Sequence, residues 1–412
     1  MTIATVKSNT KKLLKMGADE LMDKVHFFRE SEKIEETAFK PDATGHSPGD
    51  TVSIRIPTNW VVQEDDFDIT STMQTAKERT VNAVLDKSAT VPFDLTSEEL
   101  ASDIDIGKVY ERLVQPAILD LAANIESRLL AQATQYTGNT VGTAGATIVD
   151  PDTVMAGGEL MDEMLAPQDM RKFLMDSAAM RSAVNANKGL FTFKRKEYDD
   201  AFIGNALGFD WFKSQLVYRH TNGNDVTGVA VEADVVTPAE GATTLGVDGL
   251  TANTGTITKG TVFTIAGVYS VHPQTKVSTG KLKQFSHVGA TVTADASGYA
   301  TLTLNEPIYS SASGSLQNVS ALHADEASLV FVGAASTTYK QSLMFHKKAF
   351  RVCSVPLVMP TNAEISEQVT EQGISLALIR DFDVKTRKMI TRLDWLGTIV
   401  AVRPSHACRV TN

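Results

Sequence analysis

The densest group of chemically competent side chains in this sequence is acidic. Glu64, Asp65, Asp66 and Asp68 fall close together along the chain. Carboxylates at regular spacing form Ca²⁺ loops, which also need a glycine at the bend. This stretch has neither the regular spacing nor the glycine. A solvated charged loop is therefore the favoured interpretation, and we predict no resident metal and no cofactor.

Residues of other types that could act as nucleophiles or metal ligands are scattered. The chain has 8 His and 2 Cys, and no two histidines stand at the i, i+4 spacing that would place both on one metal. Cys353 lies in the apolar alternation Phe350 to Val355, which favours a buried, inert thiol. Motifs for phosphate loops, zinc proteases, thiol redox sites, nucleophile elbows and dinucleotide binding are absent from the sequence. We therefore predict no catalytic residue and no enzymatic activity.

Charge and composition exclude further classes of protein. Basic clusters at 194–196 and 387–388 lack the interleaved aromatic residues that stack on bases. A net charge of −10 opposes non-specific binding to phosphate backbones and to anionic membrane surfaces. Two cysteines are too few for a disulfide-stapled secreted scaffold, and no apolar run is long enough to span a bilayer. We expect a protein that folds in a reducing cytosol.

The N-terminal segment has the pattern of an amphipathic helical arm. Leu14, Ala18, Leu21, Val25 and Phe28 fall on one helical face, with charged residues around them. Such a helix needs a surface on which to pack. Its own subunit and a neighbouring copy or assembly partner are equally favoured.

Two alternating segments follow, with the acidic stretch between them. Residues 51–62 and 79–87 each read as a strand, which predicts a long two-stranded arm with a charged tip. A lone hairpin of this kind is marginal in water. It should therefore lie on this chain's own body or on another copy.

The rest of the chain mixes helices and strands. Apolar residues recur every four positions from Ile106 to Tyr136, which predicts a long helix bent at Pro116. Residues of the type that caps helices predict helix starts at Thr96, at Asp152 or Thr153, and at Ser177. Residues 221–320 then contain only 11 charged side chains and alternate Val, Thr and Ile between Gly, Asn and Pro turns, so they read as a small β-barrel or sandwich inserted in an α+β domain.

This order of elements resembles the P22-like coat proteins, the major capsid proteins of tailed bacteriophages. The similarity rests on Thr90 to Thr96 with Glu99-Leu100, on Gly208-Phe-Asp210, on Lys259-Gly260 with Ile265 to Val268, and on Asp394 to Pro404, which looks like the family's last strand. These segments run in family order over most of the chain. The resemblance implies the HK97-like α+β fold. The implied parts are an N-terminal arm (1–50), an E-loop (51–87), a P-domain with a spine helix (88–150), a first part of an A-domain (151–221), an inserted all-β I-domain (222–326) and the remainder of the A- and P-domains (327–412).

The resemblance also implies a function and partners. Hexamers and pentamers of one chain would form an icosahedral head around a scaffolding protein, with a portal protein at one vertex and double-stranded DNA packaged non-specifically. No membrane partner is expected, and the protein would be found in the virion and, during assembly, in the host cytoplasm. Some relatives of this fold join their subunits through covalent cross-links, and we predict none here.

Charge also suggests, as hypotheses, which residues contact other subunits or a scaffolding protein. The acidic tip would seek basic groups on the next subunit, and basic residues near the predicted spine helix are candidates. Lysines of the arm could contact an acidic scaffolding partner, although solvated lysines are an equal alternative. The candidates are Glu64, Asp65, Asp66 and Asp68 with Lys108, Arg112 and Arg128, and for the scaffold Lys11, Lys12 and Lys15.

Two other classes of protein remain as alternatives. The Thr- and Gly-rich third quarter is also compatible with a β-rich virion decoration protein or adhesin, which should be a monomer or an elongated trimer. An enzyme with an unrecognised site should be a small closed oligomer. A coat protein instead forms capsomers and very large particles.

Overall fold

The fold is described from a computed structural model, which describes residues 3–34, 46, 48–57, 60, 78–96, 114–146, 150–187, 205–386 and 388–411. The chain forms two compact units. The first comprises 1–54, 81–130 and 350–400, and the second comprises 55–80, 131–349 and 401–412. No helix among the described residues is long and apolar enough to cross a membrane.

A sheet forms the centre of the first unit. Its order is β1-β19-β22-β21-β20, and β4 pairs with β22 in antiparallel register from Lys87 opposite Gly397 to Thr96 opposite Lys388. A tight turn at Gln372 and Gly373, both with positive φ, joins β20 to β21. The strands are β1 (Glu32–Lys33), β4 (Lys87–Thr96), β19 (Phe350–Ser354), β20 (Ile365–Glu371), β21 (Ile374–Asp383) and β22 (Lys388–Ala401).

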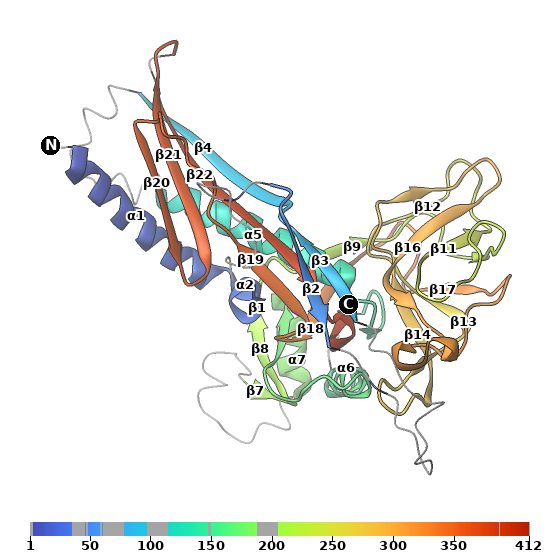
Figure 1. Ribbon diagram of the computed structural model, residues 1–412. Helices are drawn as coiled ribbons and strands as arrows, with labels where there is room; N and C mark the ends of the chain where they lie inside the picture. The colour runs from blue at the N-terminus through green and yellow to red at the C-terminus, as the bar shows by residue number, and fades with distance from the viewer. Residues whose placement is uncertain are drawn as a thin grey trace, which may run out of the picture. The chain divides into compact units, whose positions relative to one another are not determined.

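The N-terminal helices pack on this sheet. Helix α1 (Ile3–Lys24) contacts β20 and β21, and α2 (His26–Glu30) follows it (Figure 1). The five residues of the predicted apolar face are all buried. Of the two packing alternatives, the one in which the arm lies on its own subunit is therefore confirmed.

The predicted two-stranded arm and long helix are present within narrower described bounds. Strands β2 (Thr51–Ile56) and β3 (Arg79–Val84) form a two-stranded sheet. Helix α5 is described over Gln115–Tyr136 and contains Pro116, and Val114 before it is π-helical, so the predicted bend at Pro116 lies at the edge of the described residues and stays a prediction. Strand β4 ends at Thr96, where the sequence predicts the start of a helix. Residues 97–113 lie outside the described part of the chain, so that helix and the part of the long helix from Ile106 to 113 stay predictions.

A second sheet organises the larger unit. Its order is β5-β23-β18-β6-β8-β7, with β9 also paired to β18. Helices α6 (Pro151–Glu163) and α7 (Ser177–Asn187) accompany it, and Phe173, Phe209 and Trp211 lie in its core. The strands are β5 (Thr140–Val141), β6 (Arg171–Met175), β7 (Asn205–Ala206), β8 (Phe209–Lys213), β9 (Arg219–Thr221), β18 (Thr338–His346) and β23 (Ala407–Thr411). Because β23 follows β22, the prediction that Asp394 to Pro404 contains the last strand was wrong.

Two helices are capped by residues other than those predicted from the sequence. Helix α6 is capped by Asp150, whose side chain accepts the Thr153 N–H, because Pro151 fits the first helical position. Asp176, not Ser177, accepts the Ala179 N–H at the start of α7 at 2.8 Å.

The Thr- and Gly-rich region forms small antiparallel sheets around one core of its own. Val231, Leu245, Phe263, Phe285 and Leu302 are among its fully buried residues. The sheets are β10-β11-β16, β12-β15 and β14-β13-β17. The strands are β10 (Ala230–Val231), β11 (Ala242–Asp248), β12 (Thr256–Ile257), β13 (Val262–Val271), β14 (Ser278–Ser286), β15 (Val292–Thr293), β16 (Ala300–Ile308) and β17 (Leu329–Phe331). Short 3-10 helices span Ser311–Leu316 and Pro404–His406. The six-part division predicted from the sequence stays a prediction.

Candidate functional site

The predicted interface residues are only partly described. The acidic residues Glu64, Asp65, Asp66 and Asp68 lie outside the described residues, as do Lys108 and Arg112. Arg128 on α5 donates from Nη1 to the Ser88 carbonyl at 2.6 Å. Lys15 pairs with Glu371 at 3.1 Å, and the side chains of Lys11 and Lys12 are not described. The pairing predicted from the sequence therefore stays a prediction.

The N-terminal arm is held by a buried carboxylate that sequence reasoning missed. Glu126 on α5 accepts the Phe27 N–H at 2.8 Å, and its second oxygen has no hydrogen-bond partner. Burial raises the pKa of Glu126 to about 7 from its ordinary 4.5, against the lowering effects of the Phe27 and Phe28 N–H groups and Arg29. The Phe27 ring also packs on Phe350, with centroids 5.7 Å apart. The arm's attachment thus includes a group that titrates near neutral pH.

Arg409 forms the centre of a buried polar network in the larger unit. From β23 its guanidinium donates to the Gly260 carbonyl at 2.6 Å, to the Gln135 carbonyl at 3.1 Å and to Ser286 Oγ at 2.8 Å. These acceptors lie in the β-rich region and at the end of α5. Burial lowers the pKa of Arg409 to about 9 from its ordinary 12.5, and the hydrogen bonds satisfy most of its donors. A single side chain therefore ties the β-rich region to the sheet.

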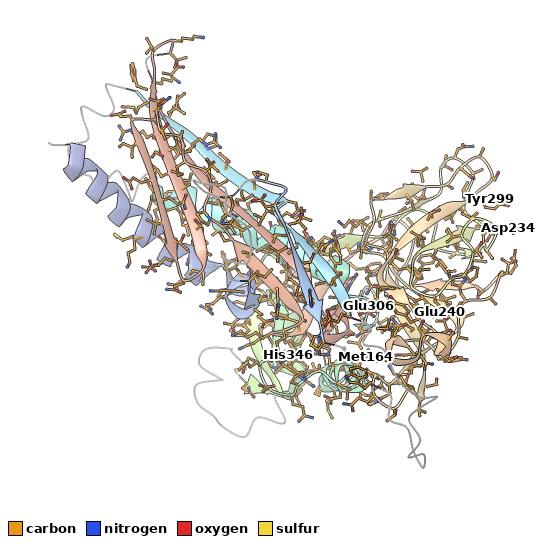
Figure 2. The ribbon with its side chains drawn as sticks, in the orientation of Figure 1. Met164, Asp234, Glu240, Tyr299, Glu306 and His346 are labelled. Carbon is orange, nitrogen blue, oxygen red and sulfur yellow. The ribbon has the colours of Figure 1, made fainter. Side chains whose placement is uncertain are left out.

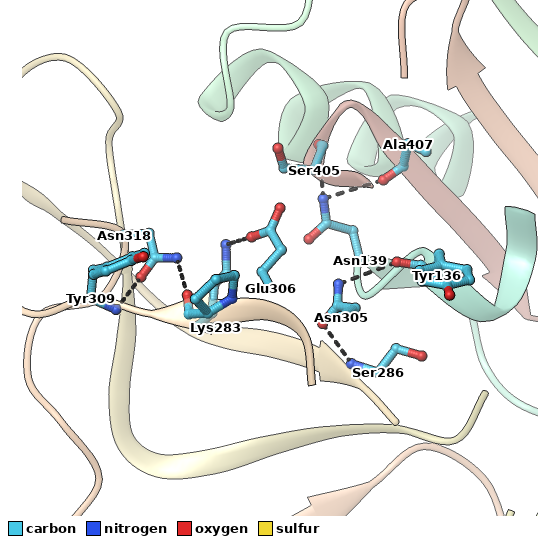
Figure 3. Close-up of polar contacts among 11 residues, drawn as sticks. Tyr136, Asn139, Lys283, Ser286, Asn305, Glu306, Tyr309, Asn318, Ser405 and Ala407 are labelled. Carbon is cyan, nitrogen blue, oxygen red and sulfur yellow. Dashed lines mark hydrogen bonds and ion pairs between the residues drawn. The ribbon is translucent and has the colours of Figure 1, made fainter. Parts of the chain in front are cut away.

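Amide side chains reinforce the same junction. Gln284 on β14 accepts the Thr140 N–H at 2.7 Å and donates to the Thr140 carbonyl at 3.1 Å. Asn305 on β16 donates to the Tyr136 carbonyl at 3.3 Å and accepts the Ser286 N–H at 3.1 Å (Figure 3). A Cβ at Gly138 would lie 2.8 Å from the Gln284 carbonyl oxygen, so the close approach requires glycine there.

A pocket of about 200 Å³ opens in the larger unit beside this network. Lys283 and Glu306 form an ion pair at 3.2 Å in its wall, both almost fully buried (Figure 3). Figure 2 labels Glu306 and Met164, which both line the pocket. Burial raises the pKa of Glu306, but Lys283 and Arg79 outweigh it and hold the pKa below its usual range. Burial, Arg403 and His346 lower the pKa of His406 to about 4, so this imidazole is neutral near pH 7.

Two further cations line the pocket. Arg79 from β3 and Arg403 before β23 are both half-buried. Among the residues that the structure describes, neither guanidinium has a hydrogen bond or an ion pair to a side chain. The pocket wall therefore carries positive charge that the neighbouring Glu306 does not neutralise.

A cluster of three acidic side chains lies in the β-rich region. Carboxylate oxygens of Glu232, Asp248 and Glu326 lie within 4.8 Å of one another, and Asp248 raises the pKa of the exposed Glu326. Exposed acidic groups of this kind are common without an ion. The expectation of no resident metal stays a prediction.

The sequence contained weak signals for the residues that were missed. Glu126 lies four positions from both Ala122 and Leu130, so it falls on the buried face of its helix. Arg409 lies between Cys408 and Val410 in a strand whose residues are all buried. Charged residues at such positions are buried only when they are paired or hydrogen-bonded.

Comparisons with known proteins identify the family. The family model described as "P22 coat protein - gene protein 5" matches residues 22–409. No curated protein sequence matches the chain. Among solved structures, the capsid of Ralstonia phage GP4 has 8% identity and a TM-score of 0.46, covering 93% of this chain and 91% of that chain. The asymmetric unit of the bacteriophage PhiM1 mature capsid has 8% identity and a TM-score of 0.45, covering 93% and 86%. The sequence match over nearly the whole chain carries the assignment. The chain belongs to the P22 coat protein family and is a major capsid protein of tailed phages, a structural protein of the virion shell and not an enzyme.

Proposed function

We propose that copies of this chain assemble as hexamers and pentamers into the icosahedral head that encloses the double-stranded DNA of a tailed phage. The family match over residues 22–409 is the observation that carries this proposal. A scaffolding protein would direct assembly in the host cytoplasm, one vertex would hold the portal protein, and packaged DNA would be bound non-specifically. The net charge of −10 suits a shell that must not hold its genome tightly.

The two-stranded arm supports contacts between copies. Strands β2 and β3 pair only with each other in the described residues. An isolated two-stranded sheet is marginal in water, so it gains stability on a neighbouring surface. A heterologous contact of this kind, repeated by rotation, closes a ring.

Charged residues extend this proposal to specific contacts. The acidic residues at 64–68 would pair with basic groups of a second copy, for which Lys108, Arg112 and Arg128 remain candidates. Arg128 is half-buried, and its hydrogen bond to the Ser88 carbonyl leaves donors for such a pairing. Lys11, Lys12 and Lys15 would meet the scaffolding protein. The exposed pair of Lys15 with Glu371 is weak enough to be exchanged for such a partner.

Sedimentation velocity tests this proposed function. The purified chain would be measured alone and with the product of its neighbouring scaffolding gene. We expect closed particles of one size with the scaffold, and sheets or irregular particles without it. A chain that stays a monomer, dimer or trimer with every neighbouring gene product would contradict the proposal.

A further inference from the structure

The pocket of the larger unit has an excess of positive charge. Lys283 is neutralised by its buried partner Glu306, and His406 is neutral near pH 7. Arg79 and Arg403 remain, and neither forms an ion pair among the described residues. Half-buried cations attract an anion more strongly than fully exposed ones, because water screens them less.

The pocket's size and donors define the class of ligand. A pocket of about 200 Å³ accommodates side chains and is too small for a folded element. Two guanidinium groups are suited to carboxylates or phosphates, which they bind through paired hydrogen bonds. His406 Nδ1 is buried and without a hydrogen-bond partner in the same wall, and it adds a neutral polar group.

We propose that this pocket receives carboxylate side chains from the acidic segment Glu64 to Asp68 of a second copy of the chain. The inference rests on the proposed function, because it assigns one contact of assembly. Charge complementarity carries it: four carboxylates lie in this segment, and no Lys or Arg occurs from residue 56 to residue 76. Lys108, Arg112 and Arg128 remain candidates for the carboxylates of this segment that the pocket does not receive. Packaged DNA is a poorer match for a pocket of this size on a chain of net charge −10.

A charge exchange between two variants tests the contact. Arg79→Glu with Arg403→Glu gives a chain with an acidic pocket and an acidic segment. Asp65→Lys with Asp66→Lys gives a chain with a basic pocket and a segment in which two lysines offset the two remaining carboxylates, Glu64 and Asp68. We expect each variant alone to need at least about tenfold more protein to assemble than the unmodified chain. Lys213→Glu with Arg219→Glu, at exposed positions that do not line the pocket, is the control and should assemble normally.

Mixing the two variants separates a contact between copies from a contact within one chain. Each variant would supply the group that the other needs, so the mixture should recover large complexes, and so should the chain carrying all four changes. Recovery only in the four-fold variant would show that the segment binds its own chain and would overturn the proposal. Normal assembly of both charge-reversed variants, or no recovery in either case, would also overturn it.

Two further measurements keep the test independent of folding and of the proposed function. If the reversed chains fold poorly, Arg79→Gln with Arg403→Gln and Asp65→Asn with Asp66→Asn replace them. Non-additive effects on assembly would then support the contact, and additive effects would refute it. In solution, a synthetic peptide of residues 61–70 should bind the unassembled chain, with at least about tenfold loss in the Arg79→Gln, Arg403→Gln variant. Binding of inorganic phosphate but not of the peptide would overturn the proposed contact and assign the pocket to phosphate. Peptide binding by a chain that never assembles would support the contact and contradict only the proposed function.

Discussion

Replacing Glu126 by Gln should remove a pH dependence from the folding stability of this protein. The carboxyl is fully buried, and burial raises its pKa from 4.5 to about 7. A raised pKa means that the folded state binds the proton more tightly than the unfolded state does. The contribution of the neutral carboxyl is therefore fully present below about pH 4.5 and is lost as the pH rises to about 7.

The size of the effect follows from the same pKa. Each tenfold change in proton affinity corresponds to about 1.4 kcal/mol, so the stability that depends on this carboxyl changes by about 3 kcal/mol between pH 4.5 and pH 7. Glutamine keeps the carbonyl oxygen that accepts the Phe27 N–H and carries no charge at any pH. The variant should lack this part of the pH dependence, whatever its stability at one fixed pH.

Urea unfolding of the unassembled chain from pH 4.5 to pH 8 measures this difference. Hydrogen exchange at the Phe27 amide provides a local probe of the arm's attachment. Glu371→Gln, a more exposed carboxylate on β20, is the matched control and should keep the pH dependence of the unmodified chain. If Glu126→Gln and the unmodified chain lose stability equally as the pH rises, the reasoning from burial is wrong.

Three other predictions concern the larger unit and the assembled shell. Arg409→Leu should lower the free energy of unfolding by about 3 kcal/mol or more, because three buried acceptors lose their donor. A melting temperature within about 1 °C of that of the unmodified chain, which corresponds to roughly a few tenths of a kcal/mol, would contradict this. Burial raises the pKa of the Cys408 thiol to about 12, so iodoacetamide at pH 8 should label it only after unfolding, and rapid labelling of the native protein would refute its burial. Assembled particles boiled in denaturant should run as a single monomer band, since we predict no covalent cross-links, and a ladder of multimers would refute that prediction.

Periodicity in the sequence predicted the helices and strands whose buried positions recur at a regular spacing. The apolar face of α1 was predicted because one helical repeat fixes all five of its positions, and all five are buried. Strands β13 and β16 lie in the region 221–320, where alternating Val, Thr and Ile residues predicted strands. The two observed caps, Asp150 and Asp176, precede the predicted ones by one to three residues.

Contacts between distant segments could not be predicted in this way. Arg409 meets the Gly260 carbonyl across 149 positions of sequence, and Glu126 meets Phe27 across 99. No local pattern encodes which backbone carbonyl will face a buried side chain. The pocket was missed for the same reason, since it joins Arg79, Glu306 and Arg403 from three separate parts of the chain.

Negative-stain electron microscopy of the purified protein, expressed alone and together with its neighbouring genes, tests the central claim most directly. We expect closed shells of uniform diameter when the scaffolding gene is present, and sheets or spirals when it is absent. A monodisperse monomer, dimer or trimer under every condition would contradict it.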